Sequence, residues 1–183
     1  MKEQTVFAMG LSALLLGAEL QAQDDPWSLL DFLEGNWTGT VEGQFGTGTV
    51  QRDYAFVLDS AYLHERNVTT YPPQDRNPEG ESHENWSFFS YDRTRDVHVL
   101  RQFHDETIVN RFVLNKSLTK GNRIVFDTEA IENFTAGWRA RESYTVVSPD
   151  EFVEEFYLAP PDGEYEMFVT NHFRRALGEG HSP

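Results

Sequence analysis

Histidines and carboxylates are the side chains of this chain that could carry metal or acid–base chemistry. His98 and His104 lie on one face of the same expected strand, but six residues at about 3.3 Å each hold them about 20 Å apart. Neither H-x-H nor H-E-x-x-H occurs, so we expect no metal site. The absence of cysteine excludes disulfides and thiolate catalysis.

Other catalytic patterns are also missing from the sequence. There is no G-x-S-x-G motif, which would place a nucleophilic serine on a strand-to-helix turn. The glycine-rich stretch 43–48 has no following lysine or helix, so it predicts a hairpin turn and not a phosphate-binding loop. Nucleophilic and phosphoryl chemistry are therefore not indicated.

Three polar residues could anchor a ligand inside a barrel: Arg101, Glu142 and His104. Arg101 shares a strand face with Val97 and Val99, and a cation on an apolar face needs a partner. That partner could be a ligand carboxylate or an internal glutamate. The alternative is that Arg101 extends its charge to solvent at the barrel rim.

Aromatic residues recur at alternate positions of several expected strands, so that they share a face. Tyr54 pairs in this way with Phe56, Trp86 with Phe88, and Trp138 with Tyr144. If these faces point inward, they suit an elongated apolar ligand. The predicted ligand-binding residues are Tyr54, Phe56, Trp86, Arg101, Phe103, His104, Trp138, Tyr144 and Phe156. The same rings could instead fill a solid core, and the pattern leaves both possibilities open.

The elements that must position these residues are almost all strands. About ten runs with strand character are separated by turn residues. They cover 36–44, 47–58, 61–71, 82–91, 96–104, 107–115, 123–132, 137–147, 151–159 and 164–175. The polar segment 72–81 predicts a loop and a candidate lid. One short helix is predicted over 25–35, where Pro26 suits the first turn and Gly35 the end.

Ten strands joined by short turns form a meander, and closing it removes both exposed edges. The sequence therefore predicts an all-β, antiparallel meander barrel over residues 23–177, with the short helix plugging one end and a disordered tail at 178–183. No alternation of strands with helices favours an α/β fold.

The ends and the charge of the chain bear on its location. An apolar run from Val6 to Gly17 is too short to span a bilayer and, with small Ala22 after it, is typical of a signal peptide over residues 1–22. We expect a soluble periplasmic or secreted protein with no membrane insertion. A formal net charge of −15 argues against nucleic-acid binding.

A family resemblance rests on Gly35-Asn36-Trp37, which follows the short helix at the start of the first strand. This G-x-W placement resembles the calycin superfamily of lipocalins and fatty-acid-binding proteins. The resemblance implies a barrel closed by an arginine stacked on Trp37, here Arg174 or its neighbour Arg175. The segments FLEGNWTG (32–39) and FFSYDRTRDVHVL (88–100), with the ending Phe173-Arg174-Arg175, are closest to bacterial secreted lipocalin-like domains of unknown function.

The chain is also distantly similar to the nitrobindin haem proteins. That likeness implies a haem-ligating histidine on the last strand, several residues before the closing arginine. The only candidate here is His172, and its spacing from Arg174 does not match, so we predict no haem or other cofactor.

Three functions remain open. We expect a binding protein for a small hydrophobic or amphipathic molecule, as a monomer or a dimer. The first alternative is a small-molecule isomerase or lyase that uses Tyr, His or Glu side chains of the barrel lumen. The second is a ligand-free interaction module with a solid barrel and an apolar patch on its outer surface.

Overall fold

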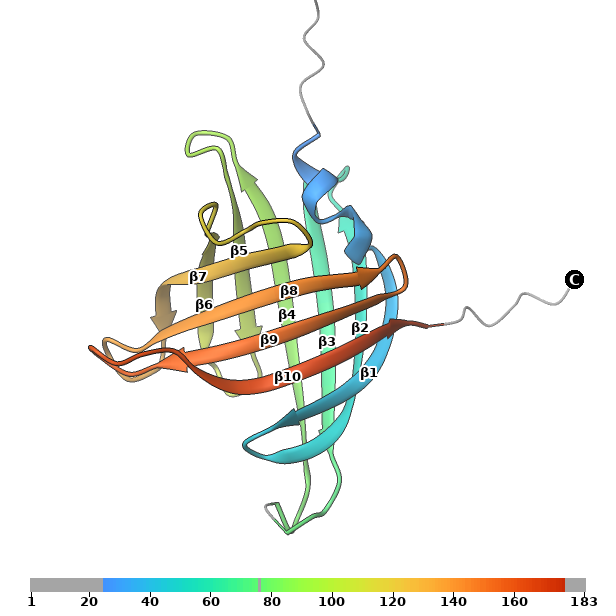
Figure 1. Ribbon diagram of the computed structural model, residues 1–183, viewed down its shortest axis with the longest axis vertical. Helices are drawn as coiled ribbons and strands as arrows, with labels where there is room; N and C mark the ends of the chain where they lie inside the picture. The colour runs from blue at the N-terminus through green and yellow to red at the C-terminus, as the bar shows by residue number, and fades with distance from the viewer. Residues whose placement is uncertain (1–24, 76, 177–183) are drawn as a thin grey trace, which may run out of the picture.

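The computed structural model describes residues 25–75 and 77–176, which form one closed barrel of antiparallel strands (Figure 1). The strands are β1 (Gly35–Gly43), β2 (Gly46–Val57), β3 (Tyr62–Tyr71), β4 (Glu81–Asp92), β5 (Val97–His104), β6 (Val109–Leu114), β7 (Arg123–Glu132), β8 (Arg139–Ser148), β9 (Glu151–Ala159) and β10 (Glu166–Arg175). The predicted all-β meander barrel is confirmed, and every strand lies within two residues of its predicted bounds or inside them.

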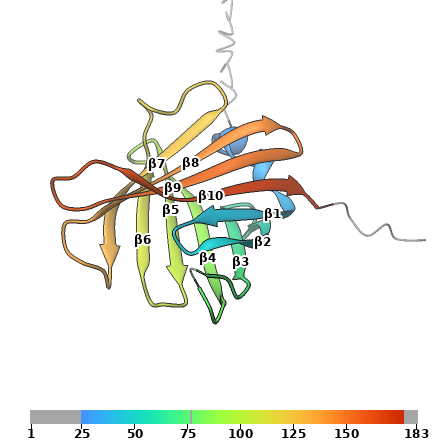
Figure 2. The same ribbon diagram turned by 60° about the horizontal axis from the view of Figure 1, so that its bottom comes forward.

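The barrel closes between its first and last strands. β1 pairs antiparallel with β10 and lies beside it in the barrel wall (Figure 2). Trp37 lies opposite Arg175 in this register. Each of the other strands pairs with its sequence neighbours, so every strand has two partners. Closure therefore satisfies the backbone donors and acceptors that an open meander would expose at its two edges.

Two short 3₁₀ turns, η1 (Pro26–Leu29) and η2 (Asp31–Leu33), occupy the place of the predicted helix. Asp25 caps the first turn by accepting a hydrogen bond from the Trp27 backbone amide. Leu30 then leaves helical geometry, at φ −121° and ψ −4°, which divides the segment into two turns. The prediction of one continuous helix is wrong, but the apolar side chains of the turns still enter one end of the barrel.

This end of the barrel, which we call the plugged end, contains the apolar core. Leu30 and Leu33 from the turns are fully buried together with Trp37, Phe152 and Phe173 from the strands. Phe152 stacks on Phe173 with ring centroids 4.6 Å apart, and its ring also meets Trp37 edge-on. The rings and the leucines of the plug belong to one packed cluster.

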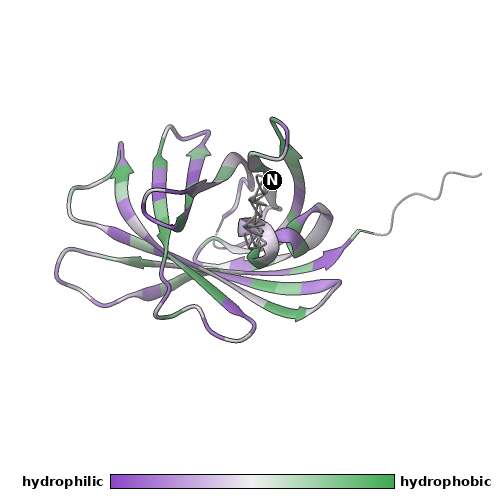
Figure 3. Ribbon diagram, turned by 90° about the horizontal axis from the view of Figure 1, so that it is seen from above, coloured by the Kyte–Doolittle hydropathy of each residue, from purple (hydrophilic) through white to green (hydrophobic). Residues whose placement is uncertain are grey.

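The strands show the alternation expected of barrel walls, with hydrophobic and hydrophilic residues in successive bands (Figure 3). β1 begins at the plugged end, so the hairpins that follow β1, β3, β5, β7 and β9 all lie at the opposite end. We call this opposite end the open end. Five connections therefore surround it, and four of these, together with the neighbouring strand ends, supply the side chains described below.

The loop predicted over 72–81 is one of these open-end connections, and it ends one residue earlier because Glu81 begins β4. Gln74 fastens it to β2 through two hydrogen bonds of 2.9 Å with the backbone of Thr47, one in each direction. Gln74 also pairs with Asn77 across the turn. None of its described residues lines the cavity at the open end, so the segment is not a lid over it in this structure.

Two sequence predictions, the signal peptide over 1–22 and the disordered tail over 178–183, lie outside the described residues. None of the helical segments in residues 25–75 and 77–176 has both the length and the apolar character needed to cross a membrane.

Candidate functional site

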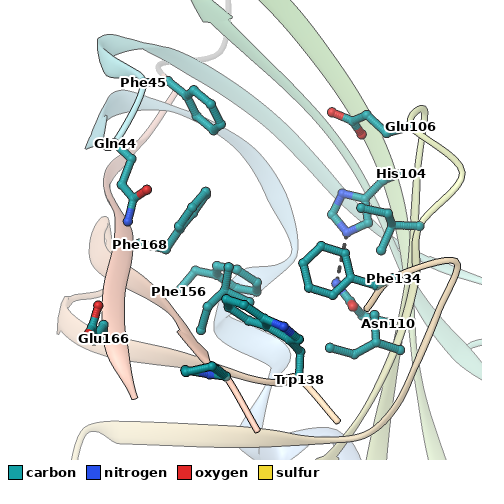
Figure 4. A pocket seen from close by; sticks show the side chains of 14 residues that line it. Gln44, Phe45, His104, Glu106, Asn110, Phe134, Trp138, Phe156, Glu166 and Phe168 are labelled. Atoms are coloured by element: carbon teal, nitrogen blue, oxygen red, sulfur yellow. Dashed lines mark hydrogen bonds between the residues drawn. The ribbon is translucent and has the colours of Figure 1, made fainter. Parts of the chain in front are cut away.

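A pocket of about 520 Å³ lies at the open end of the barrel (Figure 4). Its walls come from the β1–β2 turn, from β5, β6, β7, β9 and β10, and from the open-end connections between them. The lining residues are Gln44, Phe45, His104, Glu106, Ile108, Asn110, Ile131, Phe134, Trp138, Phe156, Leu158, Pro160, Glu166 and Phe168. Phe45 and Phe134 remain 43% and 40% exposed, so the pocket opens to solvent between these rings.

Five aromatic rings form most of the apolar wall. Phe168 contacts Phe45 and Phe156 edge-on, at centroid distances of 5.7 and 6.2 Å. Phe134 and Trp138 meet edge-on at 5.7 Å on the far side. Edge-on pairs hold each ring in a fixed orientation, which leaves flat ring faces available to a ligand.

The aromatic wall depends on an irregularity in β10. The pairing of β10 with β9 shifts between Met167 and Val169, which makes Phe168 the bulged residue. Strict alternation from buried Phe173 and Asn171 would turn Phe168 to the outside. The bulge instead places its ring in the pocket, as bulges commonly do near functional sites.

One polar pair interrupts the apolar wall. Nε2 of His104 lies 3.2 Å from the amide nitrogen of Asn110 on the neighbouring strand. Burial lowers the pKa of His104 below its usual range, so its imidazole is neutral at neutral pH. With Asn110 donating, Nε2 is the acceptor and Nδ1 carries the proton, free to donate to a ligand.

Beneath the pocket a buried polar layer crosses the barrel. Asn110 also donates to Gln102 at 3.4 Å, and Gln102 donates to Glu142 at 2.6 Å. Tyr144 donates its hydroxyl to the same carboxyl group. Burial raises the pKa of Glu142 well above its ordinary value, with nearby Glu154 adding to the shift. Burial therefore favours the protonated form of Glu142.

Arg52 is the cation of this layer. Its guanidinium donates to both carboxylate oxygens of Glu154, at 2.7 and 2.9 Å, and lies 3.4 Å from Glu65. Burial opposes the ionised form of Glu154, but Arg52 outweighs it and lowers the pKa of that carboxyl. Burial raises the pKa of Glu65, although Arg52 opposes this shift. This cation thus contacts two of the three buried carboxyl groups of the layer, and geometry assigns it chiefly to Glu154.

Three of the nine predicted ligand-binding residues line the pocket: His104, Trp138 and Phe156. Tyr54 and Tyr144 point inward but lie in the layer beneath it, where Arg52 donates to the Tyr54 hydroxyl at 3.1 Å. Phe56 is at the plugged end, with its ring 5.3 Å from that of Trp27.

The other three residues are not in the lumen at all. Trp86, Arg101 and Phe103 lie on the outer surface of β4 and β5, and Trp86 and Phe103 are 48% and 44% exposed. Arg101 donates to the hydroxyl of Ser90 at 3.0 Å. The prediction assigned the inward face by its aromatic content, whereas the burial of Phe89 and Gln102 shows that the opposite face points inward.

The barrel closure also requires a correction. Arg175, and not Arg174, stacks on Trp37, with its guanidinium carbon 4.3 Å from the ring centroid. Arg174 is 80% exposed and lies 3.9 Å from Glu151. The reason is register: Arg175 is directly opposite Trp37 and therefore shares its inward face.

Several pocket residues were missed because they lie in turns or at a bulge, where alternation gives no direction. Phe45, Glu106 and Phe134 are in connections, and Phe168 is at the bulge. The sequence did contain a signal for the buried layer. Arg52 shares a strand face with Val50 and Tyr54, and Glu154 shares one with Phe152 and Phe156. Charged residues at inward positions of a strand mark such a layer.

One cluster among the described residues has side chains that could ligate a metal. His83 contacts Glu106 and lies 4.0 Å from Asp105, and its Nε2 lies 3.1 Å from Glu81. All these side chains are about one-third to one-half exposed. The cluster was not predicted, because it combines β4 with the β5–β6 hairpin. His172, the haem candidate, is exposed on the outside of β10 and cannot reach the pocket.

No family model matches the sequence, and no curated protein sequence matches it. Among solved structures the chain is similar to "Rv2717c from M. tuberculosis", with a TM-score of 0.62 and 15% identity over 83% of this chain and 98% of that one. A redesigned beta barrel aligns with a TM-score of 0.37 and 14% identity, over 80% of this chain and 94% of that one. The likeness to the mycobacterial protein is one of fold: both chains form the same kind of barrel.

Proposed function

We propose that this protein binds a small hydrophobic or amphipathic molecule in the open-end pocket. The observation that carries the proposal is a pocket of about 520 Å³ in which five aromatic rings surround one neutral, hydrogen-bonding histidine. A largely apolar cavity of this size with few polar groups is typical of small-molecule sites. His104 would orient a polar end of the ligand, while the rings enclose its apolar body.

The calycin resemblance supports the same proposal. The Trp37–Arg175 stack, the plug at one end and the hairpins around the other are the features that this resemblance implies. We further propose that the protein works outside the cytoplasm, on the basis of the apolar run Val6 to Gly17.

Catalysis by an isomerase or lyase is less well supported by the geometry. The titratable side chains among the described lining residues are His104, Glu106 and Glu166. The carboxyl group with the strongly raised pKa, Glu142, lies beneath the pocket behind Gln102. Glu142 is not among the residues that line the pocket. We therefore propose that it supports the pocket through its hydrogen bond with Gln102 and does not contact a substrate.

The test uses a neutral fluorescent probe, N-phenyl-1-naphthylamine, whose emission rises in apolar surroundings. We expect saturable binding with one site per chain. The variant Phe156→Ala, which removes one wall of the pocket, should weaken binding about tenfold or more, since a buried aromatic contact contributes about 1.5–3 kcal/mol.

The matched control is Trp86→Ala, which removes an aromatic ring from the outer surface of the barrel. This variant should bind the probe as the parent chain does. No saturable binding, or equal losses in the two variants, would contradict binding in the pocket. Circular dichroism of both variants establishes that they are folded.

A further inference from the structure

We propose that the pocket selects ligands with a positively charged head group, an amine or a quaternary ammonium ion on an apolar body, over ligands that end in a carboxylate. This inference rests on the proposed function and specifies its ligand class. It draws on the charges at the opening, on the neutral interior and on the aromatic wall, which come from different strands.

The opening carries negative charge on two sides. The carboxylates of Glu106 and Glu166 lie on opposite sides of the pocket (Figure 4). Both residues are exposed. Glu106 belongs to the cluster in which Glu81 and Asp105 also surround His83, so three carboxylates share one imidazole. Even a protonated His83 would leave this side of the opening negative.

No lysine or arginine is among the described residues that line the pocket. Arg139, which follows Trp138 in the chain, instead stacks 5.1 Å from the centroid of the Tyr165 ring. His104 is kept neutral by burial. A carboxylate head group would therefore meet neutral hydrogen-bond donors at most, while losing its hydration and approaching two anions.

A cation would meet favourable partners at every level of the pocket. Trp138, Phe156 and Phe168 present aromatic rings, whose faces attract cations, most strongly where water is excluded. The carboxylates at the rim add a longer-range attraction that depends on ionic strength. The chain as a whole has a formal net charge of −15, which favours the approach of cations over anions.

The experiment compares three probes with the same octyl chain: octyltrimethylammonium, octanoate and octan-1-ol. Each is titrated into the full chain by calorimetry at about 20 mM and at about 500 mM salt. The charges at the rim act on the ligand at the lower concentration and are largely screened at the higher one. We expect the ammonium probe to bind at least about tenfold more tightly than octanoate at low salt. This ratio should shrink at high salt, while octanol changes little.

Two variants test whether the preference arises in the pocket. The double variant Glu106→Gln/Glu166→Gln should lose about five- to tenfold in affinity for octyltrimethylammonium and keep its affinity for octanol. The matched control is Glu34→Gln, which removes a charge from an exposed residue at the plugged end. It should leave both affinities unchanged.

The outcomes separate this inference from the proposed function. If octanoate binds as tightly as the ammonium probe, the charge preference is overturned and the binding function stands. If Glu34→Gln loses as much affinity as the double variant, the preference is a property of the whole surface and the inference fails. If none of the three probes binds, both the inference and the proposed function fail.

Discussion

The guanidinium of Arg175 lies over the ring of Trp37, with its central carbon 4.3 Å from the centroid. The same guanidinium donates to the backbone carbonyl oxygens of Glu34 at 2.8 Å and Phe32 at 3.1 Å. Trp37 in turn donates its indole N–H to the carbonyl of Leu33 at 2.7 Å. This pair therefore joins the first strand, the last strand and the plug.

Replacing Arg175 with alanine should lower the free energy of unfolding by about 2–4 kcal/mol. The variant loses the cation–π contact and leaves the partly buried carbonyl of Phe32 without this donor. Urea denaturation measures this loss. Arg174→Ala is the control, because its side chain is exposed, and we expect a change of at most about 0.5 kcal/mol. Equal losses in the two variants would show that the stack does not hold the plug in place.

The buried layer predicts an unusual dependence of stability on pH. Burial raises the pKa of Glu142 in the folded chain, so the folded state binds more protons than the unfolded state above the unfolded pKa, about 4.3. The stability that this group contributes is therefore present below about pH 4.3 and is lost as the pH rises through the folded pKa. Glu142→Gln should flatten this decline in urea-denaturation midpoints measured between about pH 5 and pH 9.

Glu154→Gln serves as the opposite case in the same layer. Arg52 outweighs burial and holds the pKa of Glu154 low in the folded chain. The stability that Glu154 contributes is therefore present above its unfolded pKa and is lost as the pH falls through its folded pKa. At neutral pH this substitution breaks the two-bond contact with Arg52 and should cost about 3–5 kcal/mol. If Glu142→Gln were as costly as Glu154→Gln at neutral pH, Glu142 would not be the protonated member of the layer.

The direction of the strand faces can be tested with two phenylalanines. Phe89 is fully buried in the lumen, and Phe103 is 44% exposed on the outer wall. Phe89→Ala should cost about 3–5 kcal/mol because it leaves a cavity among packed rings. Phe103→Ala should cost less than about 1 kcal/mol. Thermal unfolding of the two variants measures the difference, and a reversed order would contradict the assignment of the faces.

The protonation of His104 can be measured directly. Burial lowers its pKa from the ordinary value of 6.5, so an NMR titration of its ring protons should show a midpoint below 6.5. A ligand that fills the pocket should shift these resonances and leave those of exposed His172 unchanged. A midpoint at or above 6.5 would mean that the imidazole is charged near neutral pH, and the argument against anionic ligands would then weaken.

The barrel could be predicted from sequence because each of its signals is local. Turn residues such as Lys120-Gly121-Asn122 and Ser148-Pro149-Asp150 separate the strands, and alternation within each strand marks two faces. Such signals depend on neighbouring residues along the chain. They therefore predicted the number and bounds of the strands.

Which face points inward is not a local property. Trp86 and Phe103 suggested a lumen because they are aromatic, but their faces are decided by the pairing of β4 and β5 with the rest of the barrel. The interior instead accepts Arg52 and Glu154, because they satisfy each other across the barrel from residues far apart in sequence. The pocket wall contains Phe45 and Phe134, whose directions are set by turns. The alternation of residues within a strand does not indicate which face points inward, and it does not indicate where a side chain in a turn points.

The pairing of β1 with β10 also fixes where both ends of the described chain leave the fold. The amide of Ala176 donates to the carbonyl of Asn36 at 2.8 Å, and Pro26 accepts a hydrogen bond at its carbonyl from His98 at 2.6 Å, so both ends are anchored beside the plug. The pocket opens at the opposite end of the barrel, among the connections β1–β2, β5–β6, β7–β8 and β9–β10. A support, a fusion partner or a surface attached through either end would therefore leave the opening facing outward, ready for ligand exchange.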